Sequence, residues 1–296
     1  MNLYGGIETG GTKCVCMVAE GPDNIIAETV FSTTTPDETI RQAVTFFNEQ
    51  MRVNRVAALG IGTFGPIDLD PESPTFGYIT TTPKPGWGNV NLVKKIEKEL
   101  QIPVVIDTDV NAAAMGEYLW GSALGIDPFV YFTIGTGIGM GGLINGSLMH
   151  GLLHPEAGHM IMRRNALQDP YEGFCAYHHD CFEGLASGPA MQSRWGQSSN
   201  TLPDDHPAWK LEAAYIAQAM VNTILMLSPR RIVLGGGVMQ RRHLFAMINR
   251  EVVEMLGGYV KSPVILNRID DYIVPAKLGG RAGVLGAIAL AVQAYS

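Results

Sequence analysis

Four residues that commonly bind zinc lie in one short stretch near the middle of the chain. They are His159, Cys175, His178 and Cys181. Two residues separate Cys175 from His178, and two more separate His178 from Cys181, so one loop can surround a tetrahedral ion. Thiolate and imidazole ligands suit zinc better than magnesium or calcium. Because four protein ligands fill a tetrahedral shell, we predict a structural zinc with no open position for water.

Two carboxylates flank this Cys/His loop, Glu156 upstream and Glu183 downstream. A zinc-bound histidine usually donates its second ring N–H to an oxygen partner. If Glu156 and Glu183 border a substrate pocket, a substrate hydroxyl could be that partner of His159. The alternative is that the cysteines are small buried apolar residues and the histidines ordinary polar ones. The clustering, and loop-forming neighbours such as Gly173, favour the metal.

Composition argues against several classes of protein. The 296 residues are 46% hydrophobic, enough for two packed domains, and the net charge is −7. Without a Lys/Arg-rich run, nucleic acid and membrane are not expected partners. The N-terminal residues lack a signal-peptide pattern, and no apolar run reaches transmembrane length. Cys14 and Cys16 have strand spacing, so the cysteines form no disulfide framework and we expect a cytoplasmic location.

A glycine turn joins the first two expected strands. Leu3 to Glu8 and Cys14 to Ala19 have strand patterns, and Gly10-Gly-Thr-Lys13 lies between them. This order is a hairpin, unlike the strand-to-helix turn of a Walker loop or a dinucleotide fold. Backbone N–H groups of such a turn can still bind phosphate, supported by the Thr12 hydroxyl and the Lys13 charge. An ordinary glycine-rich hairpin is the alternative.

The same strand–turn–strand arrangement occurs again later in the chain. Phe129 to Ile134 leads into the glycine-rich segment 135–142, and Leu143 to Leu148 returns. Two equivalent hairpins indicate a duplicated fold with a phosphate between its halves. A third glycine loop, Gly235-Gly-Gly237, follows the expected strand Arg231 to Leu234. Clustered glycines allow a backbone to approach a ligand closely.

Two carboxylates lie at the tip of a buried strand. Pro103 to Ile106 leads into Asp107-Thr-Asp109, and a helix is expected from Asn111 to Trp120. Because α/β folds bind ligands at the carboxyl ends of their strands, Asp109 is a candidate general base. Asp109 could instead be an ordinary helix N-cap. Asp107 has the same strand parity and is a competing candidate for the base.

The other segments supply the elements that position these motifs. Apolar runs predict strands, and a 3.6-residue period predicts helices. The remaining strands are expected at Ile25 to Phe31, Val56 to Ile61 and Tyr78 to Thr82, with short strands or extended segments at Val264 to Ile269 and Tyr272 to Pro275. Helices are expected at Pro36 to Asn54, Asn91 to Leu100, Gly184 to Trp195, Pro207 to Leu227, Arg241 to Leu256 and Gly283 to Tyr295.

Together these motifs resemble the ROK family of sugar kinases, in the actin-like/hexokinase superfamily. The resemblance spans nearly the whole chain. It rests on Gly10-Gly-Thr-Lys13, Gly135-Thr-Gly-Ile-Gly139, Glu156-x-Gly-His159, the Cys/His loop through Glu183, and Leu234-Gly-Gly-Gly237. It implies an α/β fold of two actin-like ATPase (ribonuclease H-like) domains, with a cleft between them and a zinc-binding loop. We assign residues 1–118 to the first domain and 119–282 to the second, with the closing helix at about 283–296 packing back on the first.

The resemblance also implies roles for individual residues. Asp109 is expected to be the catalytic base, and the sugar is expected to contact Gly65, Glu156, His159 and Glu183. Structural Zn2+ is expected on His159, Cys175, His178 and Cys181. Glu8 is expected near the Mg2+ that accompanies ATP. The expected nucleotide-binding residues are Gly10, Gly11, Thr12, Lys13, Thr133, Gly135, Thr136, Gly137, Pro189, Gly235, Gly236 and Gly237.

The chain departs from the family pattern at three positions. Glu8 replaces a common Asp, Thr108 replaces the Asn of many glucokinases, and His178 replaces one zinc-ligating Cys. The strings Cys175-x-Tyr-His-x-Asp-Cys-x-Glu183 and Leu185-Ala-Ser-Gly-Pro189 resemble the bacterial fructokinase branch. We therefore predict a fructokinase that uses ATP to convert D-fructose to fructose 6-phosphate.

Several alternatives to a fructokinase stay open at this point. One is a kinase for mannose, glucose or an amino sugar, and another is a non-catalytic sugar sensor. A ROK repressor would carry a DNA-binding domain ahead of the first glycine turn, and here that turn begins at Gly10. Domain closure and a homodimer are further expectations from the resemblance.

Overall fold

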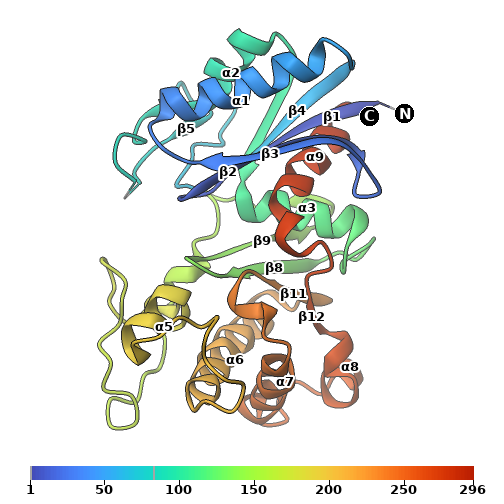
Figure 1. The fold of residues 1–296 in the computed structure, drawn as a ribbon. Helices are drawn as coiled ribbons and strands as arrows, with labels where there is room; N and C mark the ends of the chain where they lie inside the picture. The colour runs from blue at the N-terminus through green and yellow to red at the C-terminus, as the bar shows by residue number, and fades with distance from the viewer. Residues whose placement is uncertain (1, 83) are drawn as a thin grey trace.

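The first half of the molecule is built on a five-stranded sheet (Figure 1). In this computed structural model, which describes residues 2–82 and 84–296, the strand order is β3-β2-β1-β4-β7. The strands are β1 Leu3–Thr9, β2 Lys13–Gly21, β3 Asn24–Ser32, β4 Val56–Thr63 and β7 Val104–Thr108. β4 and β7 run parallel to β1, and the register aligns Glu8 with Gly62 and Gly62 with Asp107. The first glycine turn and Asp109 therefore lie at one edge of this sheet.

The second half repeats this arrangement. Its sheet has the order β10-β9-β8-β11-β12, with a glycine turn between β8 and β9 as there is between β1 and β2. The strands are β8 Phe129–Ile134, β9 Ile138–Ile144, β10 Ser147–Leu148, β11 Arg231–Gly235 and β12 Ile273–Pro275. β8 and β9 are antiparallel, whereas β11 runs parallel to β8. The predicted duplication of the fold is confirmed.

Two small-residue helices lie between the sheets (Figure 1). They are α3 Asp109–Trp120 and α9 Ala282–Tyr295, and α9 packs on β1, β2 and β4 while α3 packs on β8 and β9. Their backbones approach so closely that a Cβ added at Gly286 would lie 2.0 Å from the Ala112 carbonyl oxygen. At Gly60 of β4, an added Cβ would lie 1.7 Å from the Ala287 carbonyl oxygen. Only glycine fits at either crossing, so these positions fix how the helices join the two halves.

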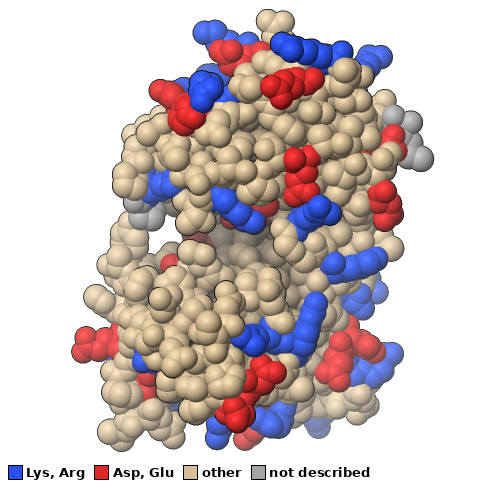
Figure 2. Space-filling view, viewed as in Figure 1, with Lys and Arg blue, Asp and Glu red and all other residues tan. Residues whose placement is uncertain are grey.

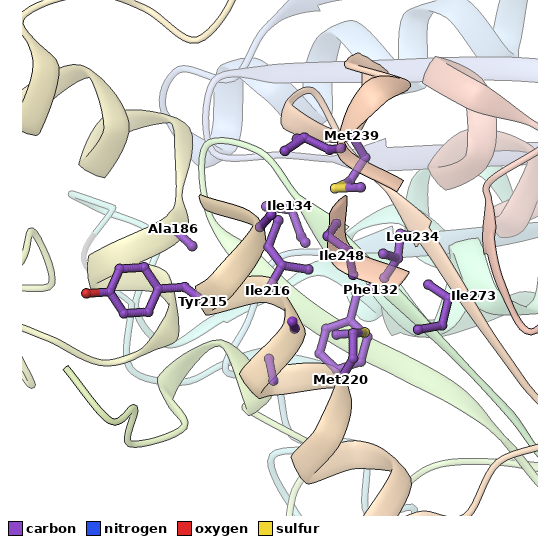
Figure 3. Packing of buried hydrophobic residues seen from close by; sticks show 14 of the residues in the cluster. Phe132, Ile134, Ala186, Tyr215, Ile216, Met220, Leu234, Met239, Ile248 and Ile273 are labelled. Carbon is purple, nitrogen blue, oxygen red and sulfur yellow. The ribbon is translucent and has the colours of Figure 1, made fainter. Parts of the chain in front are cut away.

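The outer faces of both sheets are covered by amphipathic helices. α1 Pro36–Met51 and α2 Leu92–Leu100 cover the first sheet, and the Thr35 hydroxyl caps α1 by accepting the Glu38 N–H at 3.4 Å. α6 Ala208–Leu227 and α7 His243–Leu256 cover the second sheet. Figure 3 shows the core beneath them, where Phe132 and Leu234 of the sheet face Ile216 and Met220 of α6. This packing gives the second half a core of its own.

Three predictions about local structure were wrong. The segment predicted as extended from Val264 to Ile269 forms α8 Pro263–Asn267 and a 3-10 turn, η3 Ile269–Asp271. Pro263 favours the first turn of a helix, and only Ile265 of α8 is buried. The single helix predicted from Gly184 to Trp195 is two helices, α4 Phe182–Ala186 and α5 Gly188–Trp195. Ser187 is extended and its hydroxyl caps α5, whose first turn contains a proline that cannot continue α4.

The second glycine turn is also shorter than predicted, because β9 begins at Ile138 inside the glycine-rich segment. The later glycines belong to the strand, where helix α3 crosses it. A Cβ added at Gly141 would lie 2.6 Å from Oδ1 of Asn111. These glycines therefore permit helix packing, and the turn itself consists of Gly135, Thr136 and Gly137.

The remaining elements are short. β5 Tyr78–Ile79 pairs with β6 Val90–Asn91, and single 3-10 turns occur at η1 Ala157–His159, η2 Val238–Gln240 and η4 Gly279–Arg281. Across residues 2–82 and 84–296, no helix is long and apolar enough to cross a membrane.

Candidate active site

The first glycine turn presents an open backbone at the end of β1. Gly10 N–H donates to the Lys13 carbonyl at 2.9 Å, and the Thr33 hydroxyl donates to the Gly10 carbonyl at 2.8 Å. The Lys84 ammonium donates to the Gly11 carbonyl at 2.6 Å. Gly11, Thr12 and Lys13 are exposed. The Thr33 and Lys84 side chains support the turn through its carbonyl oxygens, so exposed backbone N–H groups of the turn can bind an anion.

The second glycine turn is held from two directions. Gly135 N–H donates to the Gly137 carbonyl at 2.9 Å, and Gly188 N–H donates to the Gly135 carbonyl at 2.7 Å. This second bond places Pro189, at the start of α5, beside the turn. The Glu183 carboxylate accepts the Ile138 N–H at 2.9 Å. One expected sugar ligand therefore also supports the expected phosphate turn.

A cavity of about 330 Å³ lies between the first and third glycine loops. Among the predicted residues, it is lined by Glu8, Lys13, Thr133 and the 235–237 loop. Figure 2 shows a hollow between the upper and lower parts of the molecule, with Lys and Arg side chains at its rim. Lining residues that the sequence did not indicate include Tyr131, Gln240, Arg242, Gly279 and Gly280. The Gly279-Gly280 pair ahead of the last helix is a signal that could have pointed to part of this lining.

Glu8 projects a buried carboxylate into this cavity beneath α9. Its Oε2 is buried without a hydrogen-bond partner, and a Cβ added at Gly283 would lie 2.3 Å from its Cδ. Burial raises the pKa of Glu8, while the charge of Lys13 lowers it. An unpartnered carboxylate oxygen beside an anion-binding turn fits a hard cation such as Mg2+. The predicted magnesium residue therefore has the chemistry that its role needs.

The two aspartates at the end of β7 have very different surroundings. Asp107 is buried and accepts hydrogen bonds from Thr108 N–H at 2.7 Å and from the Asn111 amide at 2.9 Å. Its other oxygen lies 2.8 Å from Nε2 of His150. Because both carboxylate oxygens of Asp107 are engaged, neither is positioned to accept a proton from a substrate.

Asp109 lies at the start of α3, and no side chain in the described part of the protein donates a hydrogen bond to its carboxylate. Burial, followed by the negative charge of Glu8, raises the pKa of Asp109 to about 7, and the charge of Glu156 contributes as well. Asp109 is therefore near enough to the expected magnesium residue and to one expected sugar residue for both charges to act on it.

The carboxylates predicted for sugar binding gather around the same point. Burial and then the charge of Glu183 raise the pKa of Glu156. His159 lies between them in sequence on η1, and Gly65 lies at the start of the loop that follows β4. The four residues come from both halves of the molecule. The charges of Glu8 and Glu156 both act on Asp109, so the residues predicted for magnesium, for the base and for the sugar lie in one region of the molecule.

The four predicted zinc ligands converge. Their ligand atoms all lie within 4.8 Å of one another. Nδ1 of His159 lies 3.7 Å from Sγ of Cys175 and 3.6 Å from Sγ of Cys181, and Nδ1 of His178 lies 3.8 Å from Sγ of Cys175. Zinc bonds of about 2.1 to 2.3 Å in a tetrahedron give ligand separations of about 3.5 to 3.8 Å, so this cluster fits the ion. Binding through Nδ1 would leave Nε2 of His159 free to face a substrate.

The comparisons with known proteins agree over the whole chain. The ROK family profile matches residues 4–294. A protein of Bacillus subtilis strain 168, provisionally named a fructokinase, is 48% identical over 292 residues, which are 99% of this chain and 96% of that protein. The fructokinase of Lactococcus lactis subsp. cremoris is 42% identical, covering 99% of this chain and 98% of its own.

Solved structures share the fold. The ROK glucokinase of Streptomyces griseus, in complex with glucose and AMPPNP, superposes with a TM-score of 0.78 at 24% identity and covers 99% of this chain and 100% of its own. The ROK hexokinase of Thermus thermophilus gives a TM-score of 0.77 at 23% identity, covering 99% and 98%. The predicted pair of actin-like halves is confirmed, and the chain belongs to the ROK family.

Proposed function

We propose that this protein is an ATP-dependent fructokinase that phosphorylates the 6-hydroxyl of D-fructose. The observation that supports the proposal is Asp109, a buried carboxylate whose pKa is raised to about 7 by burial and by the charges of Glu8, which lines the cavity of about 330 Å³, and of Glu156. The choice of fructose is supported by the near-full-length relatives of 41 to 48% identity that are named fructokinases.

Phosphoryl transfer depends mainly on positioning and on neutralising charge. The exposed backbone N–H groups of the two glycine turns would bind the ATP phosphates, and Lys13 adds a positive charge. Glu8 would hold Mg2+, which offsets phosphate charge when bound. The third glycine loop, at Gly235, would lie along the nucleoside. These roles account for the predicted nucleotide-binding residues on both sides of the cavity.

Asp109 would accept the proton of the fructose 6-hydroxyl as the sugar oxygen bonds to the γ-phosphorus. The bond between that phosphorus and the bridging oxygen of ADP breaks, and ADP leaves with the electron pair. A base whose pKa is near the working pH is ionised in a large fraction of the molecules and still has a high affinity for the substrate proton. Asp107 cannot substitute for it, because both of its oxygens are already engaged.

Glu156, Glu183 and His159 would bind the sugar hydroxyls. Zinc on the Cys/His loop would be structural, fixing the ring of His159 through Nδ1 so that Nε2 meets a hydroxyl. Glu183 would connect the sugar to the second phosphate turn, because its carboxylate also accepts the Ile138 N–H. Sugar binding would thus be linked to the geometry of the phosphate turn.

The larger-scale predictions fit this function. Residues 1–118 with the closing helix would form one body and residues 119–282 the other, and closure of the cleft would exclude water from the γ-phosphate. A cytoplasmic homodimer remains our prediction for the location and assembly.

The test is ADP release with Mg-ATP across fructose, mannose, glucose, N-acetylglucosamine and N-acetylmannosamine. A clear kcat/KM preference for fructose supports the proposal. A preference for another sugar keeps the kinase and replaces the substrate. No turnover with any of the five sugars would overturn the kinase proposal.

A further inference from the structure

One histidine connects the two halves of the molecule beside the proposed sugar site. The side chain of His154 is 4% exposed, and it follows β10 in the second half. Its Nε2 lies 3.2 Å from the backbone nitrogen of Ile67, in the loop that follows β4 of the first half. The ring also lies against Gly65, where an added Cβ would be 3.0 Å from Nε2. The predicted sugar-contacting loop therefore rests on the His154 ring.

The partners of His154 determine its protonation state. The Ile67 backbone nitrogen can only donate, so Nε2 of His154 must accept and carries no proton. Nδ1 lies 3.4 Å from Oε1 of Glu156. A carboxylate oxygen is an acceptor, so the proton of the ring belongs on Nδ1. The contacts therefore require a neutral imidazole with its proton on Nδ1.

The loop that His154 supports is itself fixed. The side chain of Ile67 is buried, and its backbone bridges to Ile79 of β5. Thr80 N–H donates to the Pro66 carbonyl at 2.8 Å, and Asp68 N–H donates to the Tyr78 carbonyl at 2.9 Å. His154 is thus attached to a rigid part of the first half. A histidine held in this way can fix the position of the Glu156 side chain.

Glu156 lies near a second carboxylate, that of Glu183. The Glu156 side chain is about half exposed, and burial and then the charge of Glu183 raise its pKa. The other charged or titratable groups near His154 are Asp107 and His150, whose Oδ2 and Nε2 atoms lie 2.8 Å apart. The Nδ1–H group of His154 is therefore the donor placed to hold Glu156.

We propose that His154 is a positioning residue for the sugar site, joining the Gly65–Ile67 loop of the first half to the Glu156 carboxylate of the second. This inference rests on the proposed sugar kinase function. His154 itself transfers no proton in the reaction. It fixes the two sides of the sugar pocket relative to each other, so its loss weakens sugar binding without altering nucleotide binding.

Three variants and equilibrium sugar binding test this role. His154→Phe keeps the ring volume but removes both polar contacts. His154→Asn places its amide nitrogen near Nδ1, so it can still donate to Glu156. His206→Phe is the matched control, because it makes the same chemical change at a histidine whose Nδ1 accepts the Ala208 N–H outside the cleft.

For His154→Phe we expect the sugar KM and the sugar Kd to rise about tenfold, as expected for loss of a hydrogen bond to a charged group. The KM for Mg-ATP should stay within about twofold, and kcat should fall by less than about threefold. His154→Asn should recover most of the sugar affinity, and His206→Phe should resemble the wild type. A wild-type sugar KM in His154→Phe, or equal losses toward sugar and ATP, would overturn the inference.

A second measurement does not depend on turnover. Long-range ¹⁵N–¹H correlation spectra of the zinc-loaded protein distinguish the two neutral imidazole tautomers. We expect the signals of His154, assigned by their absence in His154→Asn, to show a protonated Nδ1 and an accepting Nε2 at pH 7.5. The opposite tautomer would overturn the inference even in an active kinase. A wild-type protein without sugar kinase activity but with the expected tautomer would instead refute the proposed function.

Discussion

The pH dependence of the reaction follows from the position of Asp109. Burial and the neighbouring Glu8 raise the pKa of this carboxyl to about 7, and only the ionised form can accept a proton. A group with a pKa of about 7 is ionised in roughly a tenth of the molecules at pH 6 and in roughly nine tenths at pH 8. We therefore expect kcat/KM for the sugar to rise about tenfold between pH 6 and pH 8 and then level off.

The assay is initial-rate ADP release at saturating Mg-ATP, with nucleotide binding measured separately at each pH so that titration of the nucleotide is taken into account. His150 is the main competing source of a change in this range, since its hydrogen bond to Asp107 raises its pKa. His150→Gln removes that titration and should leave the rise with pH in place. A flat profile from pH 6 to 8, or a rise that disappears in His150→Gln, would refute the assignment of this pKa to Asp109.

Three further predictions concern individual residues. Asp109→Asn should lower kcat by about 10²-fold or more with a small effect on sugar Kd; activity near that of the wild type would disprove the assignment. The same variant should also be more stable than the wild type at pH 8, by a few degrees in Tm, and equal to it near pH 4. This follows because the folded-state pKa of Asp109 is raised, so stability falls as pH rises between about 4 and 7; calorimetry at the two pH values tests it. Cys181→Ser should lose bound zinc, as measured by metal analysis, and should have a raised sugar KM. The control is Cys14→Ser, at a buried cysteine far from the Cys/His loop in sequence, which should keep its zinc. Equal zinc content in the two variants would exclude Cys181 as a ligand.

The features that the sequence predicted best are those made by residues close together in the chain. A turn such as Gly10 to Lys13 is closed by its own backbone, and two such turns predicted the duplicated fold. Three of the zinc ligands lie within one short loop, so their spacing alone restricts where an ion can lie. The choice between Asp107 and Asp109 stayed open because strand parity is the same for both. The hydrogen bonds that engage both oxygens of Asp107, one of them with distant His150, distinguish the two residues.

Features that depend on contacts between distant segments were not predicted. Two hydrogen bonds join residues far apart in the chain: the Ile138 N–H donates to the Glu183 carboxylate, and the Ile67 N–H donates to Nε2 of His154. Local sequence patterns do not indicate such pairs. The glycines of β9 were assigned to the turn because their small size suits either a ligand or a crossing helix. Only the position of α3 against Gly141 shows that helix packing is the reason. The helix after Ser262 is a different case, because Pro263 favours a first helical turn and only Ile265 of α8 is buried.

The central claim is transfer of phosphate from ATP to the 6-hydroxyl of fructose, and identification of the product tests it most directly. The protein is incubated with Mg-ATP and uniformly ¹³C-labelled fructose, and the sugar carbons are followed by NMR. The account predicts phosphorus coupling on C6, with one ADP formed for each fructose 6-phosphate. Phosphate on another carbon, or ADP formed without any sugar phosphate, would contradict it.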